Sequence, residues 1–197
     1  MKILFSSIAC VVLWSVVNLV EAQTASSLSA SDHDTPLFTL IDSVAKKTGK
    51  KFIIDPRVRA QVTLIGAKPE SLDYPALLSV LEMNNFSAVE VGSYVRVLPA
   101  PDVRDQPVPT VVAGKHYDDS EVVTRVVNVK SVPVTQLLQV LRPLLPNFAH
   151  VGIVTCTNTL MIVDRFANVQ RVAGLIEAMD KGEPYKPRDC APEDTKK

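Results

Sequence analysis

Between positions 34 and 98, stretches in which apolar residues recur every three or four positions alternate with short runs of β-forming residues. A repeat of three or four residues predicts a helix from the capping segment Asp34-Thr35-Pro36 to a stop at Gly49. The same repeat predicts a second helix from Asp73 to Asn84. Short runs of β-forming residues indicate strands, and a Ser-rich stretch before the first helix is a further candidate for a short edge strand. The strands are expected at 27–30, 52–54, 62–65, 88–91 and 94–98.

The same succession of helical repeats and β-forming runs resumes after a stretch in which apolar residues have no regular spacing. Residues 99–119 contain Pro99, Pro101, Pro107 and Pro109 among charged residues, which is typical of a linker. Beyond it the spacing predicts, in chain order, a strand at 122–129, a helix at 134–141, strands at 151–155 and 160–163, and a helix that opens near Asp164 and ends by Asp180.

These patterns predict an α+β protein made of two small mixed α/β-sandwich domains. The first has the element order βαββαββ and the second the order βαββα. The Pro-rich, charged end of the chain predicts a mobile tail. The expected boundaries are 1–22 for a signal peptide, 23–98 for the first domain, 99–119 for the linker, 120–181 for the second domain and 182–197 for the tail.

The first 22 residues have the features of a secretory signal peptide. Lys2 precedes an apolar stretch at 8–17, and Val20-Glu21-Ala22 offers a processing site. The apolar run is shorter than the roughly 20 residues that a membrane span needs. An uncleaved anchor and lipidation of Cys10 are the alternatives. Cleavage would release a periplasmic chain that begins at Gln23.

Export changes the interpretation of the cysteines. Removal of the signal would leave only Cys156 and Cys190, in an oxidising compartment. One disulfide between them is therefore a candidate. Two unrelated thiols are the alternative, and the sequence leaves both open.

The composition excludes several classes of protein. The chain has 21 Lys and Arg residues against 21 Asp and Glu, with 6% aromatic residues, so it has neither the basic surface nor the stacking platform of a nucleic-acid binder. Its seven glycines are too far apart for a phosphate loop, a dinucleotide fingerprint or a nucleophile elbow. Its three histidines lack metal-ligand spacing. We therefore expect no cofactor, no metal and no small-molecule substrate.

The acidic residues of the chain do not form a recognisable reactive site. Asp32-His33-Asp34 precedes a predicted helix, where such residues usually act as caps, and 118–121 would keep the linker soluble. Asp55 and Asp164 each follow an apolar strand, but the two-domain organisation places them on separate units, so they cannot share a cleft. No Ser or Cys lies in a motif that carries a base. We expect no enzyme activity.

Two stretches of sequence resemble the periplasmic domains of secretins. The run Phe52-Ile53-Ile54-Asp55-Pro56-Arg57-Val58-Arg59, followed by Val62-Thr63-Leu64, resembles the first periplasmic domain, above all that of the type II secretion secretins (general secretion pathway protein D). The stretches 119–127 and 158–164, with Asn168-Val169, resemble the second periplasmic domain. Ala60, where the family favours glycine, and Asn128, where it often has proline, are departures.

The resemblance implies a fold and a role. The fold would be a secretin/TonB short N-terminal domain followed by a KH-like, NolW-like secretin domain. The role would be that of a non-enzymatic periplasmic component or accessory of type II secretion, a docking and ring-stacking module without the outer-membrane pore of the family. Alternatives are the signalling domain of a TonB-dependent-receptor-like system, a type IV pilus secretin-like accessory, and a non-functional truncated secretin.

The resemblance also implies partners and a location. The implied partner is the inner-membrane clamp protein of type II secretion (general secretion pathway protein C), with a full-length secretin and secreted substrates as further candidates. The location would be the periplasm, in association with the outer membrane through a secretin complex.

The partner-binding residues expected in the first domain are Val62, Thr63, Leu64 and Ile65. The weak candidate strand at 27–30 would leave their backbone N–H and C=O groups facing solvent. A partner can add a strand to such an edge, with main-chain hydrogen bonds supplying affinity. The alternative is that residues 23–31 fold back over the edge.

Overall fold

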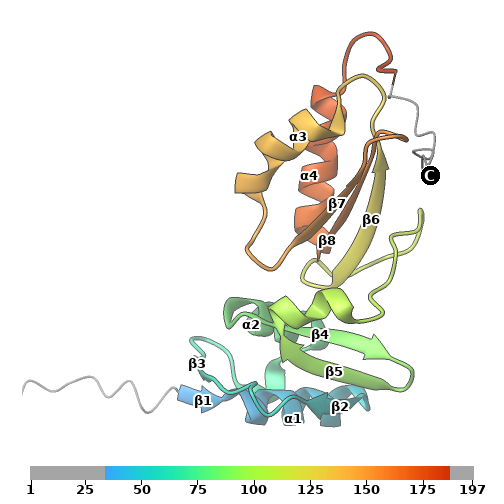
Figure 1. Ribbon diagram of the computed structural model, residues 1–197. Helices are drawn as coiled ribbons and strands as arrows, with labels where there is room; N and C mark the ends of the chain where they lie inside the picture. The colour runs from blue at the N-terminus through green and yellow to red at the C-terminus, as the bar shows by residue number, and fades with distance from the viewer. Residues whose placement is uncertain (1–33, 187–197) are drawn as a thin grey trace, which may run out of the picture. The chain divides into compact units, whose positions relative to one another are not determined.

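The computed structural model describes residues 34–186. Its first seven helices and strands follow one another in the order that the sequence predicts (Figure 1). Their order is βαββαββ, so the expected order of the first domain is confirmed. The elements are β1 (Asp34–Pro36), α1 (Leu37–Thr48), β2 (Lys51–Ile54), β3 (Gln61–Thr63), α2 (Tyr74–Met83), β4 (Phe86–Val91) and β5 (Tyr94–Pro99).

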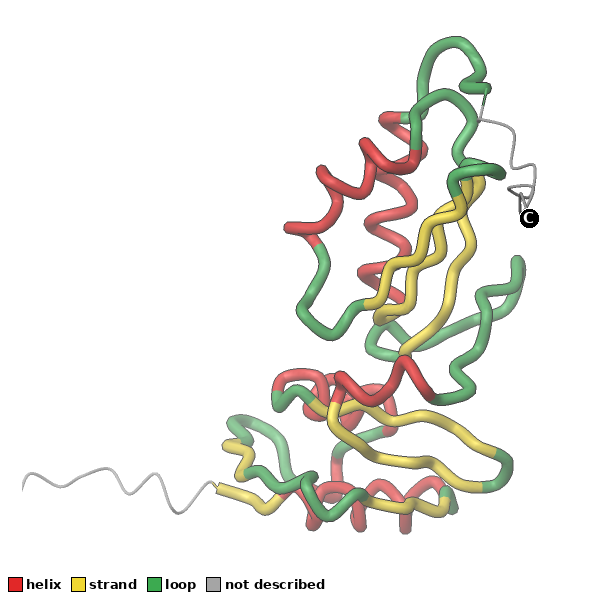
Figure 2. The backbone as a smooth tube through the Cα atoms, in the orientation of Figure 1, coloured by secondary structure: helices red, strands yellow, loops and turns green. Residues whose placement is uncertain are grey.

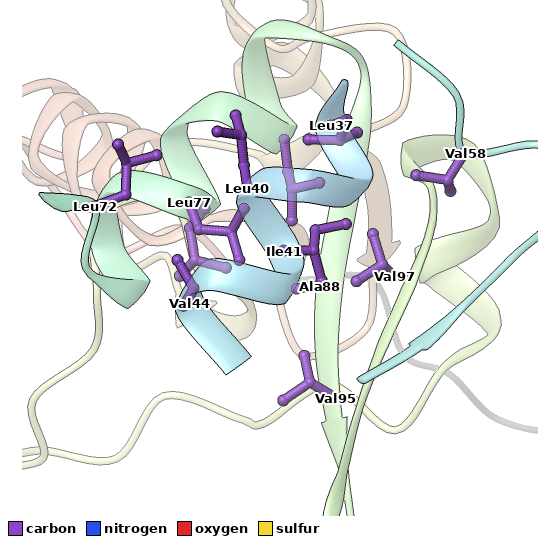
Figure 3. Packing of buried hydrophobic residues seen from close by; sticks show 12 residues of the cluster. Leu37, Leu40, Ile41, Val44, Val58, Leu72, Leu77, Ala88, Val95 and Val97 are labelled. Atoms are coloured by element: carbon purple, nitrogen blue, oxygen red, sulfur yellow. The ribbon is translucent and has the colours of Figure 1, made fainter. Parts of the chain in front are cut away.

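The strands of this half form two separate sheets. One has the order β2-β5-β4, with β2 parallel and β4 antiparallel to β5, and the other is the antiparallel pair β1-β3. Helices α1 and α2 bury their apolar faces against each other and against β4 and β5 (Figure 3). Leu40, Val44, Leu77 and Leu81 are completely buried in this core.

The second half has the order βαββα, which confirms the expected order of the second domain. Its strands form one antiparallel sheet, β6-β8-β7, and both helices lie against the same face of that sheet (Figures 1 and 2). The core between helices and sheet includes Leu137, Leu160, Ile162 and Val172. The elements are β6 (Val122–Asn128), α3 (Val134–Leu141), β7 (His150–Val154), β8 (Thr159–Arg165) and α4 (Phe166–Met179).

The expected start of the first helix is wrong. Residues 34–36 form strand β1, and α1 begins at Leu37 with no side-chain cap. The Asp34 carboxylate accepts a hydrogen bond from the Thr63 hydroxyl, at 2.7 Å, instead of capping the helix. The pairing with β3 therefore takes the segment that the local pattern assigned to the helix.

The bounds of other elements differ from the prediction by one or two residues. Strand β3 ends at Thr63, so Leu64 and Ile65 follow the strand instead of belonging to it. Asp164 lies within β8, and α4 opens two residues later at Phe166. The candidate strand at 27–30 lies outside the described residues.

The Pro-rich segment 99–119 makes more contacts than a free linker would. Residues 100–105 form a 3₁₀ helix whose Val103 is buried against Val89, Leu98 and Val122. Tyr117 is also buried, and its hydroxyl accepts a hydrogen bond from the Val112 N–H. Apolar and hydrogen-bonded contacts thus fix both ends of this segment.

The carboxyl-terminal part of the described chain is anchored in the same way. The Asp180 carboxylate accepts hydrogen bonds from the backbone N–H groups of Lys130, Ser131 and Val132. The Tyr185 N–H donates to the Lys130 carbonyl at 2.7 Å.

None of the helices within residues 34–186 is long and apolar enough to cross a membrane.

Candidate partner-binding site

The candidate site is the sheet β1-β3 and the loop that follows it. Asp34 pairs with Thr63, Thr35 with Val62 and Pro36 with Gln61. In the part of the chain that the structure describes, this sheet contains these two strands alone, so the outer edge of β3 has no partner strand there.

The pairing determines which backbone groups of β3 face outward. The Leu37 N–H donates to the Ala60 carbonyl at 3.0 Å, so these two residues face each other across the ladder. Hydrogen-bonded and non-hydrogen-bonded pairs alternate along antiparallel strands, which turns the groups of Val62 toward β1. Those of Gln61 and Thr63 therefore point away from β1, to the free edge.

Exposed apolar side chains lie beside this edge. Ile65 is 90% exposed and Leu64 is partly exposed. They line a shallow groove of about 880 Å³ together with residues 66–68, Glu70 and Ser71. Phe38, in the first turn of α1, is 69% exposed and lies on a second groove of about 380 Å³ that includes Pro36 and Gln61. Free backbone groups and apolar side chains thus occur together on this surface.

An ion-pair network fixes the loop that leads into β3. Arg57 donates to both carboxylate oxygens of Asp55, at 3.0 and 2.8 Å, and to Asp102 at 2.6 Å. The Arg57 backbone N–H also donates to Asp55. The side-chain bond from Arg57, followed by this backbone bond, lowers the pKa of Asp55 to about 2. The Asp55-Pro56-Arg57 motif is therefore a structural clamp between the loop and the 3₁₀ helix at 100–105.

The predicted site residues do not all face the free edge, because Val62 turns its backbone groups toward β1 and packs against the core, so the expectation of solvent-facing backbone groups is wrong for Val62. Val62 and Thr63 lie in β3, and Leu64 and Ile65 extend it into the groove. Phe38 was missed by sequence reasoning, because a phenylalanine in an amphipathic helix is normally expected to face the core. Its exposure can be recognised only once the helix has been placed.

The other candidate residues do not form a reactive site. No group of metal-ligating side chains occurs in residues 34–186. Asp55 is clamped by Arg57, whereas Asp164 is buried and accepts hydrogen bonds from Asn168 and from the Arg165 N–H. Burial raises the pKa of Asp164, although these hydrogen bonds oppose the change. The two carboxyl groups thus serve separate structural purposes.

The predicted disulfide falls partly within the described chain. Cys156 is disulfide-bonded in the structure. Cys190 lies outside the described residues, so the pairing of Cys156 with Cys190 stays a prediction.

Comparison with known proteins gives matches over both halves. Residues 32–97 match the family described as the GspD-like N0 domain, and residues 124–184 match the bacterial type II/III secretion system short domain. Secretin XcpQ of Pseudomonas aeruginosa is 32% identical over 150 residues, which are 75% of this chain and 22% of XcpQ. Secretin PulD of Klebsiella pneumoniae is 32% identical over 168 residues, which are 82% of this chain and 25% of PulD.

A solved structure agrees with these matches. It is the Klebsiella pneumoniae type II secretion system outer membrane complex, described as containing PulD, PulS and the PulC HR domain. The superposition has a TM-score of 0.66 at 30% identity and covers 75% of this chain and 26% of the other. The chain thus spans about a quarter of the length of the secretins that it matches.

The fold and the matches define the class as the amino-terminal domains of bacterial secretins, which are non-enzymatic. Within that class, residues 32–184 belong to the GspD-like secretins of type II secretion, with an N0 domain followed by the short secretin domain. The family resemblance and the fold class expected from the sequence are therefore confirmed.

Proposed function

We propose that this chain is a periplasmic docking module of the type II secretion apparatus, and that it binds the inner-membrane clamp protein (general secretion pathway protein C) through the outer edge of β3. The observation that carries the proposal is the outer edge of β3, which has no partner strand within residues 34–186 and lies near exposed Ile65 and Phe38. The Klebsiella complex supports the choice of partner, since it contains the HR domain of PulC together with PulD and PulS.

The chemistry of the edge suits a partner strand. Thr63 presents an outward N–H, and Ile65 supplies apolar surface next to it. Main-chain hydrogen bonds from an added strand would provide affinity, and the two grooves would receive its side chains. A fold-back of residues 23–31 would compete for the same edge.

The proposal also includes a location. The predicted signal peptide at 1–22 would deliver the chain to the periplasm, and the relative PulD is part of an outer membrane complex. Intact-mass measurement of periplasmic extract tests this part. A mass that begins at Gln23 supports it, whereas a chain that retains Trp14, or carries lipid on Cys10, contradicts it.

A proline substitution tests the docking edge. Thr63→Pro removes one outward N–H, and proline is tolerated at sheet edges. We expect it to weaken binding to the periplasmic region of the clamp protein at least about 10-fold in a calorimetric titration, the loss of roughly one hydrogen bond to the partner. The control is Thr63→Val, which removes the hydroxyl bond to Asp34 but keeps the N–H.

The proposal fails if the wild-type chain does not bind, or if Thr63→Pro, shown to be folded by circular dichroism, binds as tightly as Thr63→Val.

A secretion assay in cells distinguishes a working component from a non-functional truncated secretin. Deletion of its gene should lower the secretion of type II substrates, and unchanged secretion would contradict a working role.

A further inference from the structure

Within residues 34–186 the outer edge of β7 has no backbone partner, whereas the opposite edge of the same sheet is paired at Thr124. On β6, the Val111 N–H donates to the Thr124 carbonyl and the Thr124 N–H donates to the Pro109 carbonyl, both at 2.8 Å. Beyond the end of β6, the Tyr185 N–H donates to the Lys130 carbonyl. Within residues 34–186, no hydrogen bond joins the backbone of β7 to any segment other than β8.

The register shows which groups this edge presents. Thr124 directs its backbone groups away from β8, and it lies opposite Val163, so the groups of Val163 point toward β7. Val163 pairs with His150, whose groups therefore face β8. Orientation alternates along an antiparallel strand. The N–H and C=O groups of Val151 and Ile153 consequently point outward.

The β7 edge also lacks the charges that normally prevent strand pairing. Residues 143–163, which contain β7 and most of β8, include no Lys, Arg, Asp or Glu. The edge strand β2 of the first half differs, because Lys51 begins it and Asp55 follows it. Uncharged edges of β-forming residues are the ones that pair with other chains.

An apolar stripe on the open face of the sheet leads to this edge. Met161 lies opposite Val126 on one side and opposite Gly152 on the other. Val126 is 53% exposed and Met161 is 37% exposed. A Cβ atom on Gly152 would lie 3.3 Å from the Met161 Cε, so the methionine side chain extends over the glycine. The stripe therefore continues across β8 to the outer strand.

We propose that β7 pairs with β7 of a second copy of this chain, antiparallel, with Gly152 opposite Gly152. Val151 of each copy then faces Ile153 of the other, and each such pair exchanges two N–H···O bonds. His150 faces Val154, so no like charges meet. The apolar stripes of the two copies join into one across the two-fold axis. A second copy fits this edge because the edge is uncharged and self-complementary.

Charge substitutions at the two-fold axis test the pairing. Gly152→Glu and Gly152→Lys each place like charges opposite each other, which destabilises cross-strand pairs. Each variant alone should weaken self-association at least about 10-fold in sedimentation equilibrium of the exported chain, since like-charged cross-strand neighbours repel. An equimolar mixture of the two should restore it, because Glu then faces Lys.

The control is Ile53→Glu, which adds a charge to β2, an edge strand of the first half, and should leave self-association unchanged. Circular dichroism and thermal unfolding confirm that each variant is folded. A wild-type chain that stays monomeric up to about 1 mM, the range of very weak pairing, overturns the proposal. So does a folded Gly152→Glu chain that associates as tightly as the wild type. Binding of the clamp protein at β3 does not depend on either result.

Discussion

One buried asparagine connects three segments of the second half. Asn158 is 3% exposed and has a φ of 49°, in the left-handed region that asparagine tolerates better than most residues. Its Oδ1 accepts the Val134 N–H at 2.9 Å, and its Nδ2 donates to the carbonyls of Val129 and Val132. It therefore stabilises the β7-β8 turn and caps the start of α3 at the same time.

We expect Asn158→Ala to lower the free energy of unfolding by about 2–4 kcal/mol, because it leaves buried backbone groups without partners and places alanine at a positive φ. Urea unfolding measures this change. The control is Asn128→Ala, which removes an exposed hydrogen bond to Thr159 and should cost less than about 1 kcal/mol. Equal losses in the two variants would show that Asn158 has no special structural role.

The clamp in the β2-β3 loop gives a pH prediction. The pKa of Asp55 is about 2 in the folded chain, below its ordinary 3.8. The stabilisation that Asp55 provides is therefore fully present above about pH 4 and is lost as the pH falls through 2. Arg57→Met should return the pKa of Asp55 toward 3.8 in an NMR titration of the carboxyl carbon. An Asp55 that still titrates near 2 in this variant contradicts the assigned cause.

At the scale of helices and strands, the elements with a strong local pattern were predicted best. The apolar faces of α1 and α4 follow the helical repeat of their own sequences. Asp73, where the second helix was expected to begin, caps α2 by accepting the Ala76 N–H. Strand β1 could not be predicted, because its three residues include an aspartate and a proline, and its pairing with β3 is a contact between distant parts of the chain.

The candidate site was predicted only in part, for the same reason. The β-forming run at 62–65 indicated a strand near the right position, and the structure bears out β3 at Gln61–Thr63. The direction of the Thr63 N–H depends on the register with β1, which the sequence pattern does not contain. The exposure of Phe38 likewise depends on how α1 packs. Local patterns locate elements, whereas tertiary pairing determines which groups remain free.

At the scale of the whole molecule, a polar junction joins the two halves of the described chain. Arg165, whose side chain is 7% exposed, lies 3.3 Å from the Glu82 carboxylate and 4.3 Å from the center of the Phe148 ring. The Ser120 hydroxyl donates to the same carboxylate at 2.7 Å. The apolar cluster around Val103 includes Val122, which pairs with Arg165 across the sheet. The halves are therefore in direct contact as well as being connected through 99–119.

We expect Glu82→Ala to destabilise the chain by about 1–3 kcal/mol, because it leaves a buried guanidinium without its carboxylate partner. Calorimetry measures the loss, and trypsin should cut faster at Arg104 and Lys115 as the halves separate. The control is Glu90→Ala, which removes an exposed ion pair with Lys50 and should cost less than about 1 kcal/mol. Unchanged stability and cleavage in Glu82→Ala would show that the junction contributes nothing.

Site-specific photocrosslinking in cells tests the central claim most directly. A photoreactive phenylalanine derivative at position 65, where the side chain is 90% exposed beside β3, should crosslink to the inner-membrane clamp protein. The same derivative at position 83, on α2, is comparably exposed at 83% and should not crosslink to it. Crosslinking to the clamp protein from position 65 alone is the result predicted by docking through β3. No crosslink at position 65, or equal crosslinking from both positions, would contradict it.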